Sequence, residues 1–316
     1  MIKKMTPQEV RIPMDVPAES RLTYATNYLK ATRETGRLML FACDQKIEHM
    51  NADFYGEGID IADCEPEHLF KIGQNGVIGV LAGQRGLIAR YAGDYPELNY
   101  LVKMNSKTNL VKTKQEDPYS PQLTDLEAVL QMRDNGVNIV GLGYTIYLGS
   151  EYEATMMAEA GQLIAQAHEC GLLVVLWIYP RGKAVTAEKD PDLIAGAAGV
   201  ALCLGADFVK VNAPSPEDGR EPAEALAIAS KAAGRCGLVC AGGGTVDAKT
   251  FLTQLNDQIQ IGGACGNATG RNIHQRSEDE AVRLTKAISA ITLADKSVDE
   301  ALEIFEGKKD FGYSDI

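Results

Sequence analysis

The chain has 316 residues, of which 45% are hydrophobic and 23% are charged, values typical of a folded globular protein. This length is enough for one large barrel or for two ordinary domains. The formal net charge of -12 argues against nucleic acid or an anionic membrane surface as the main partner, but it allows an anionic small molecule at a locally positive site.

The seven cysteines are odd in number and lie mostly in apolar runs. We interpret them as reduced core residues, because disulfide frameworks belong mainly to small secreted chains. Residues 1–17 lack the apolar stretch of a signal peptide, and the longest strongly apolar run, 172–179, is too short to cross a bilayer. We therefore expect a cytoplasmic protein without a membrane partner.

Units of a helix, a glycine and a strand repeat along the chain. The glycines that separate an amphipathic stretch from an aliphatic run are Gly36, Gly76, Gly136, Gly171, Gly205 and Gly237. Because glycine commonly follows the last helical residue, each of these positions predicts a helix-to-strand loop. One more strand is expected in the long gap after Gly76, and another follows a predicted helix near 247–255. The predicted strands are 38–44, 77–82, 100–105, 137–144, 172–179, 207–212, 238–241 and 258–264.

Strands that alternate with helices at this spacing imply parallel βαβ units with right-handed crossovers. Eight such units in roughly 250 residues fit a (β/α)8 TIM barrel. An open doubly wound sheet is the alternative, but no glycine-rich dinucleotide fingerprint follows the first strand. We expect a single domain: a barrel at about 37–295, an N-terminal extension over 1–36 with a helix at 21–35, and a C-terminal segment over 296–316 with a helix at 297–305.

Lys210 is unusual because it lies in the middle of a short apolar strand. Phe208 and Asn212 share its face, since side chains of a strand alternate with period two. A lysine on the solvated face of an edge strand is the alternative, but a closed barrel has no free edge. Burial lowers the pKa of a lysine, and a neutral amine is what Schiff-base chemistry requires.

Other polar and aromatic side chains come at the carboxyl ends of the predicted strands, where the chemistry of this fold takes place. Those that we expect to face the barrel interior are Asp44, Lys103, Asn105, Trp177 and Tyr179. Together they predict a charged and partly dry constellation around the lysine of the sixth strand.

Glycine-rich turns follow the last two strands. They contain Gly242, Gly243 and Gly244 after the seventh strand, and Gly270 and Arg271 after the eighth. Exposed backbone N–H groups of such turns bind phosphate, and these two loops form the recurrent phosphate site of the fold. An arginine adds a bidentate positive charge. A triple glycine alone is equally typical of a flexible turn, and the second loop is what favours a phosphate site.

Taken together, these segments resemble the archaeal-type (DhnA-like) class I fructose-bisphosphate aldolases, which are (β/α)8 barrels of archaea and bacteria. The matching segments, in the family's order, are 44–49, 100–108, 177–182, 208–212, 242–244 and 270–272, and residues 54–56 are similar to the bacterial branch. The resemblance implies Lys210 as the Schiff-base lysine, Tyr179 as general acid and base, Asp44 and Trp177 as substrate contacts, and phosphate binding by Gly242, Gly243, Gly270 and Arg271.

The implied reaction is the reversible cleavage of fructose 1,6-bisphosphate to dihydroxyacetone phosphate and glyceraldehyde 3-phosphate, as in glycolysis and gluconeogenesis. The implied partner is a phosphorylated ketose, and no metal or other cofactor is expected. Members of the family are often pentamers or decamers, so the resemblance also implies a homo-oligomer.

The chain departs from the family at two places. Family members often have Asp-His-Gly on the first strand, where this chain has Asp44-Gln45-Lys46, and a serine often stands at Ala241. The first change leaves the second phosphate site open, although Lys46 offers a positive charge for that phosphate, and the second change removes a hydroxyl donor from the first site. We expect substrate contacts from Lys46, His49, Lys103, Asn105 and Asn212.

Three other functions are weighed against this one. A metal-dependent aldolase needs clustered ligands, usually histidines, and the four histidines show no ligand spacing. Related Schiff-base barrels, namely a transaldolase-like synthase, deoxyribose-phosphate aldolase and tagatose-bisphosphate aldolase, remain open because they share a lysine on the sixth strand. A non-catalytic sugar-phosphate-binding module would not require the set of lysine, tyrosine and aspartate.

Overall fold

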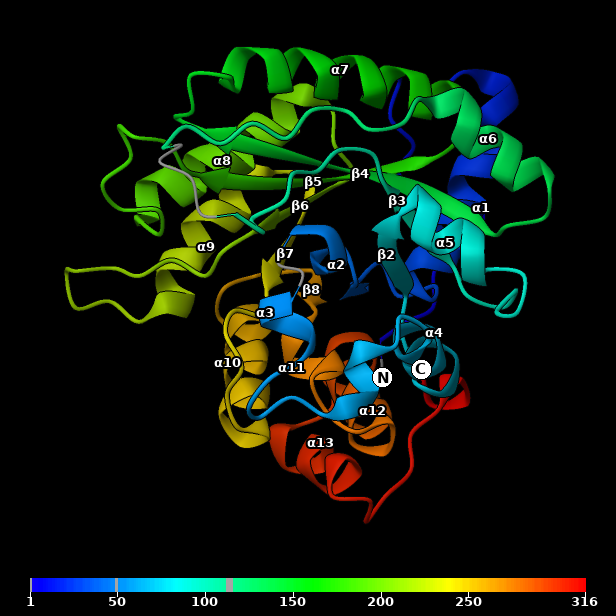
Figure 1. The fold of residues 1–316 in the computed structure, drawn as a ribbon, viewed down its shortest axis with the longest axis vertical. Coiled ribbons are helices and arrows are strands. Elements are labelled where there is room, and N and C mark those ends of the chain that lie inside the picture. The colour runs from blue at the N-terminus through cyan, green and yellow to red at the C-terminus, as the bar shows by residue number, and fades with distance from the viewer. Residues whose placement is uncertain (1, 49–50, 112–115) are drawn as a thin grey trace.

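Eight parallel strands close into a barrel in chain order, as the computed structural model in Figure 1 shows. The structure describes residues 2–48, 51–111 and 116–316. The strands are β1 (Leu38–Ala42), β2 (Val80–Gln84), β3 (Tyr100–Lys103), β4 (Ile139–Leu148), β5 (Leu173–Pro180), β6 (Phe208–Val211), β7 (Gly237–Ala241) and β8 (Gly266–Thr269). Since β1 also pairs with β8, the sheet is closed. The predicted (β/α)8 barrel is confirmed.

Helices alternate with the strands and surround the barrel (Figure 1). They are α1 (Arg21–Thr32), α2 (Gln45–Glu48), α3 (Asn51–Phe54), α4 (Glu67–Asn75), α5 (Arg85–Tyr91), α6 (Leu126–Asp134), α7 (Glu153–Glu169), α8 (Pro191–Leu204), α9 (Pro222–Ala233), α10 (Ala248–Gln260), α11 (Arg271–His274), α12 (Glu278–Ala294) and α13 (Val298–Phe305). The predicted helices before and after the barrel are present as α1 and α13.

The prediction of the eighth strand at 258–264 is wrong. Residues up to Gln260 belong to α10, whose buried Phe251, Leu255 and Ile259 recur every four residues along one helical face. The observed strand β8 consists of glycine, asparagine, alanine and threonine, so it lacks the aliphatic run that marks a strand in a sequence. These four residues were expected to form part of the following loop.

The hydrophobic core has an inner and an outer layer. The inner layer contains one or more side chains from every strand, among them Leu38, Val80, Leu101, Val140, Leu173, Phe208, Val239 and Ala268. Val209 and Val211 belong to the outer layer, between strands and helices. The predicted inward face of the sixth strand is therefore correct, and it directs Lys210 into the barrel.

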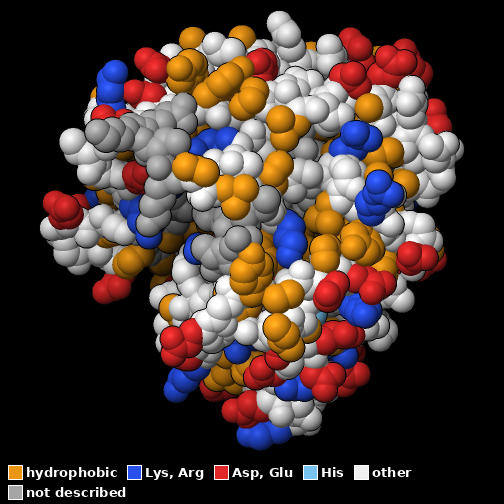
Figure 2. Space-filling view, in the orientation of Figure 1, with side chains coloured by type: hydrophobic (Ala, Val, Ile, Leu, Met, Phe, Trp, Pro, Cys, Tyr) orange, Lys and Arg blue, Asp and Glu red, His pale blue; other side chains and the backbone are white. Residues whose placement is uncertain are grey.

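Charged side chains of both signs are interspersed with hydrophobic ones over the face shown in Figure 2. In the described part of the chain, no helix combines the length and apolar character that a membrane span requires.

Candidate active site

A cavity of about 160 Å³ lies at the carboxyl ends of the strands. It brings together the predicted site residues Asp44, Trp177, Tyr179, Lys210, Asn212, Gly242, Gly243, Gly270 and Arg271. It is also lined by residues to which the sequence analysis gave no role: Gln45, Glu48, Tyr147, Arg181, Ala241 and Ala268.

Lys210 lies on β6 and lines this cavity. It is only 5% exposed, and its Nζ lies 5.3 Å from the ring centre of Trp177, which pairs with it in register on β5. Burial lowers the pKa of Lys210; the carboxylate of Asp44 opposes this shift and the charge of Lys103 adds to it. The shift is in the direction of the neutral amine, the form that attacks a carbonyl.

Lys103 is buried and does not line the cavity. Its buried Nζ donates hydrogen bonds to Asp44 Oδ2 at 3.3 Å and to Thr145 Oγ1 at 2.6 Å, and it lies 4.8 Å from the centre of the Trp177 ring. The predicted substrate contact is therefore replaced by a buried ion pair with Asp44. A charge in this position acts on the reacting groups through space.

Asp44 lines the cavity and is held there as a carboxylate. Burial alone would raise the pKa of Asp44, but the charges of Lys103 and Lys210 outweigh burial and lower it. Asp44 Oδ1 and the indole Nε1 of Trp177 have no hydrogen-bond partner among the described residues. Buried polar atoms without partners are costly, so this acceptor and this donor suit a polar substrate.

Gly143 on β4 makes room for the charged cluster. A Cβ atom at this position would lie 2.6 Å from Cζ3 of Trp177 and 3.0 Å from Cδ of Lys103. Any larger residue would displace both side chains, and with them the surroundings of Lys210.

Two tyrosines and an arginine form another side of the cavity. The rings of Tyr147 and Tyr179 lie 6.5 Å apart, and the Arg181 guanidinium lies 5.7 Å and 5.9 Å from their centres. Arg181 also forms a bidentate ion pair with Glu188, with both N–O distances at 2.8 Å. Burial and the nearby carboxylates of Asp44 and Glu48 raise the pKa of Tyr179 well above its ordinary value. Tyr179 is thus a protonated phenol at neutral pH.

Tyr147 was missed because the fourth strand was predicted to end at residue 144. In the structure β4 continues to Leu148 and pairs with β5 as far as Pro180. Glu48 and Gln45 were missed although they follow Asp44 within one helical turn, a spacing that places them beside it. Glu48 Oε1 lies 3.8 Å from Lys103 Nζ.

The two glycine loops form the wall of the cavity near β7 and β8. The N–H of Gly242 donates to Ala268 O at 3.1 Å, whereas the N–H groups of Gly243 and Gly244 have no acceptor among the described residues and suit an anion. Arg271 donates to Gly243 O at 3.1 Å, and its Nη1 lies 3.8 Å from Asp53 Oδ1. Gly244, also predicted here, lines a neighbouring cavity instead.

Asn105 does not reach the cavity. Its buried amide donates to the carbonyl oxygens of Ser120 and Thr145, both at 2.8 Å, and accepts from the N–H of Thr145 at 2.7 Å. These bonds join the segment after β3 to β4, so we assign Asn105 a structural role in place of the predicted substrate contact.

Lys46 points away from the cavity. Its Nζ lies 4.0 Å from the centre of the Phe54 ring and 3.4 Å from the carbonyl oxygens of Asp63 and Cys64. It is thus used in packing and does not supply the predicted phosphate contact. His49 lies outside the described residues.

Within the described ranges, no group of three or more His, Cys, Asp or Glu side chains is arranged to hold a metal ion. His168 lies between Asp15 and Asp207, and His274 contacts Asp63. These contacts place both histidines in the protein framework, away from the cavity.

Comparisons with known proteins agree on one family. The DeoC/LacD family aldolase model matches residues 38–276. The fructose-bisphosphate aldolase/6-deoxy-5-ketofructose 1-phosphate synthase of Methanocaldococcus jannaschii is 53% identical over 310 residues, which cover 98% of each chain. A fructose-bisphosphate aldolase structure from Slackia heliotrinireducens is 75% identical with a TM-score of 0.96, again over 98% of each chain.

One solved structure captures a covalent intermediate. It is an archaeal fructose-1,6-bisphosphate aldolase whose catalytic lysine is bound to the carbinolamine intermediate of the substrate, and it is 27% identical with a TM-score of 0.73 over 85% of this chain and 99% of that one. The chain therefore belongs to the DeoC/LacD aldolase family, and its resemblance to the archaeal-type class I fructose-bisphosphate aldolases is confirmed.

Proposed function

We propose that this protein is a class I aldolase that cleaves fructose 1,6-bisphosphate reversibly to dihydroxyacetone phosphate and glyceraldehyde 3-phosphate. The observation that carries the proposal is the buried Lys210, whose lowered pKa favours the amine in a cavity shared with Asp44 and Tyr179. The relatives named fructose-bisphosphate aldolase support the choice of substrate.

Formation of the Schiff base is the first step. The neutral amine of Lys210 attacks C2 of the ketose and forms a carbinolamine. Tyr179, protonated because its pKa is raised, donates its proton to the departing hydroxyl group, and water leaves. The product is a positively charged iminium, which the carboxylate of Asp44 stabilises.

Cleavage of the C3–C4 bond is the second step. A base removes the proton of the C4 hydroxyl, the C3–C4 electron pair moves to the iminium nitrogen, and glyceraldehyde 3-phosphate leaves an enamine behind. Asp44 and Tyr179 are the two candidate bases. We favour Tyr179, because the phenolate left by the first step has to regain a proton, whereas Asp44 is hydrogen-bonded to Lys103. Protonation at C3 and hydrolysis then release dihydroxyacetone phosphate.

The cavity has positive groups for two phosphates. We assign the C1 phosphate to the wall formed by Gly243, Gly270 and Arg271, where backbone N–H groups and a guanidinium converge. For the C6 phosphate we propose Arg181, the other arginine of the lining, in place of Lys46. Asn212 and Trp177 also line the cavity and supply hydrogen bonds to the substrate hydroxyl groups.

A second activity is favoured by the name of one relative, which is also a 6-deoxy-5-ketofructose 1-phosphate synthase. Breaking the C3–C4 bond of that product would leave the dihydroxyacetone phosphate enamine and a three-carbon ketoaldehyde without phosphate. The transaldolase-like alternative thus uses Lys210 in the same way and differs in the acceptor aldehyde. Supplying methylglyoxal together with fructose 1,6-bisphosphate, and analysing the sugar phosphates by mass spectrometry, distinguishes the two activities.

Cleavage of fructose 1,6-bisphosphate by the Lys210→Met variant tests the proposal. We expect turnover to be lost, because no amine remains to form the Schiff base. The control variant Lys308→Met should be fully active, because the Lys308 side chain is 67% exposed and does not line the cavity. We also expect full activity in EDTA, since the proposed mechanism uses no metal. Turnover by Lys210→Met, or its loss on chelation, would contradict the mechanism.

We further propose a cytoplasmic homo-oligomer acting in glycolysis or gluconeogenesis. The seven cysteines are all free thiols, which suits a reducing compartment. The family resemblance is the support for an oligomer, and light scattering that finds a monomer would contradict it.

A further inference from the structure

Asn272 on α11 is hydrogen-bonded to three positions of the glycine turn (residues 242–246). Its Nδ2 donates to Gly242 O at 2.9 Å and to Gly244 O at 3.0 Å, and its Oδ1 accepts from the N–H of Val246 at 3.0 Å. The side chain is 1% exposed and does not line the catalytic cavity. Asn272 therefore acts on a substrate only through its neighbours, which are the glycine turn and Arg271.

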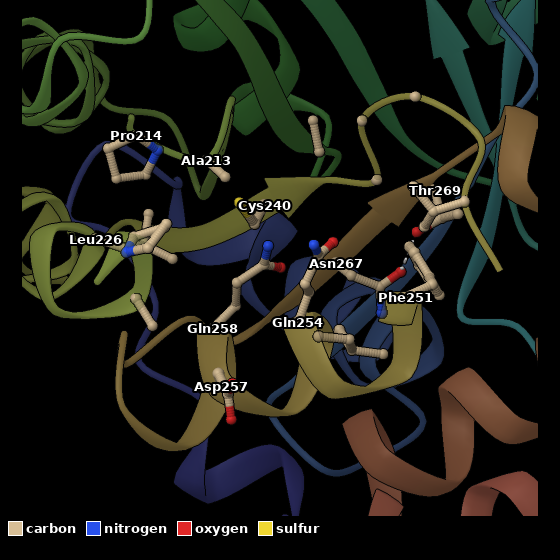
Figure 3. A pocket seen from close by; sticks show the side chains of 18 of the residues that line it. Ala213, Pro214, Leu226, Cys240, Phe251, Gln254, Asp257, Gln258, Asn267 and Thr269 are labelled. Carbon is tan, nitrogen blue, oxygen red and sulfur yellow. Dashed lines mark hydrogen bonds between the residues drawn. The ribbon is translucent and has the colours of Figure 1, made fainter. Parts of the chain in front are cut away.

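The other side of the glycine turn faces a second cavity, of about 600 Å³, between α9, α10 and the ends of β7 and β8. Figure 3 shows Pro214 and Leu226 at one end of this cavity and Phe251 and Thr269 at the other. The turn makes few packing contacts, because a Cβ atom added at Gly243 or Gly244 would have no other atom within 4 Å. Packing on this side therefore does not determine the conformation of the turn.

The turn is thus held from one side, where Asn272, Arg271 and Ala268 are hydrogen-bonded to it, while the second cavity leaves its other side without support. Gly243 has a φ of +68°, a left-handed conformation that glycine adopts without strain. Glycine also adopts other backbone conformations readily, so the residue itself does not keep the turn in this one. The hydrogen bonds of Asn272 hold Gly242, Gly244 and Val246, which are the first, third and fifth residues of the turn. An asparagine is suited to this task because one amide group both donates two hydrogen bonds and accepts one.

We propose that Asn272 is a positioning residue that holds the glycine turn in the conformation that receives the C1 phosphate of the substrate. Without its three hydrogen bonds the turn relaxes into the cavity behind it, and its N–H groups no longer converge with Arg271. The inference rests on the proposed function, since it assigns Asn272 an effect on the phosphate alone and none on the chemistry at Lys210.

The Asn272→Asp variant tests this inference. The carboxylate has the shape of the amide but would place oxygen atoms against Gly242 O and Gly244 O, so both donated bonds are lost. Asn267→Asp is the matched control: Asn267 is 2% exposed and lines the same second cavity, but it is bonded to Thr292 and Thr269 and not to the turn. The amount of borohydride-trapped adduct is measured at increasing concentrations of dihydroxyacetone phosphate. The same titration is then made with dihydroxyacetone, which lacks the phosphate.

For Asn272→Asp we expect the half-saturating concentration of dihydroxyacetone phosphate to rise at least about tenfold, as the loss of two hydrogen bonds implies. The value for dihydroxyacetone should stay within about twofold, and inorganic phosphate should become a correspondingly weaker inhibitor. Asn267→Asp should leave the ratio of the two half-saturating concentrations unchanged.

Equal shifts for both compounds, or no shift for either, would overturn the positioning role while leaving the proposed function intact. If Asn272→Asp does not fold, Asn272→Ser replaces it; its side chain ends one bond before the amide atoms that reach the turn, so a selective rise is again expected, and an unchanged ratio would again overturn the role. Failure of the wild-type protein to form an adduct with either compound would instead refute the proposed function.

Discussion

At the scale of single residues, the chemistry depends on how three buried charges are balanced. Lys103 is hydrogen-bonded to Asp44, keeps it ionised and adds to the positive potential at Lys210. A lysine beside the nucleophile thus supports the neutral amine and the carboxylate together. The sequence pattern identified Lys103 as inward, but its partner could not be predicted, because the ion pair joins residues 59 positions apart in the chain.

Lys103→Met should shift the acidic limb of the pH profile of kcat/KM to higher pH. Removing a positive charge makes it easier for the remaining pair to bind protons, whichever of Asp44 and Lys210 takes them, so both macroscopic pKa values rise. At neutral pH we expect kcat/KM to fall at least about tenfold, and the unpaired buried carboxylate should cost about 3–5 kcal/mol of stability. Lys308→Met serves as the control. A limb that stays in place, or moves to lower pH, would contradict the role of Lys103.

At the scale of elements, α1 and the N-terminal segment are joined to the barrel by a partly buried ionic cluster. His168 on α7 lies between Asp15 Oδ2 at 2.8 Å and Asp207 Oδ2 at 3.2 Å, and Tyr24 on α1 donates to the other oxygen of Asp207. Burial alone would lower the pKa of His168, but its hydrogen bonds and the charges of the two carboxylates raise it to about 9. The imidazolium therefore links three separate segments at neutral pH.

This cluster predicts a loss of stability in alkali. Because the pKa of His168 is raised on folding from 6.5 to about 9, its contribution is complete below pH 6.5 and is lost as the pH rises through 9. The amount is on the order of 3 kcal/mol. Urea unfolding should show the wild-type protein losing more stability over this window than His168→Gln, and parallel losses in the two proteins would contradict the linkage.

The elements also show what a sequence pattern can reveal. β6 was predicted correctly because aliphatic residues alternate around a single lysine, and its inward face followed from period two. β8 was missed because its residues are small and polar, and its place is set by pairing with β1 and β7. Lys46 was assigned to a phosphate from its charge, whereas contact with Phe54 depends on how α3 folds back. Hydrophobic patterns thus predict strands with aliphatic residues, but not the contacts between distant polar residues.

At the scale of the whole molecule, the His168 cluster and the catalytic cavity lie toward opposite ends of the barrel strands. The His168 cluster includes Asp207, which precedes β6, while Lys210 and the glycine turns lie toward the carboxyl ends of the strands. Changes at His168 should therefore lower stability with little effect on KM. The net charge of -12 is likewise compatible with an anionic substrate, because the cavity itself is lined by Lys210, Arg181 and Arg271.

Peptide mapping of the borohydride-trapped adduct tests the central claim, that Lys210 is the Schiff-base nucleophile, most directly. After reduction in the presence of dihydroxyacetone phosphate, we predict one modified lysine, on the peptide that contains Lys210, and no modification in Lys210→Met. An adduct on Lys103 or on a surface lysine, or an active enzyme that forms no adduct at all, would contradict the account.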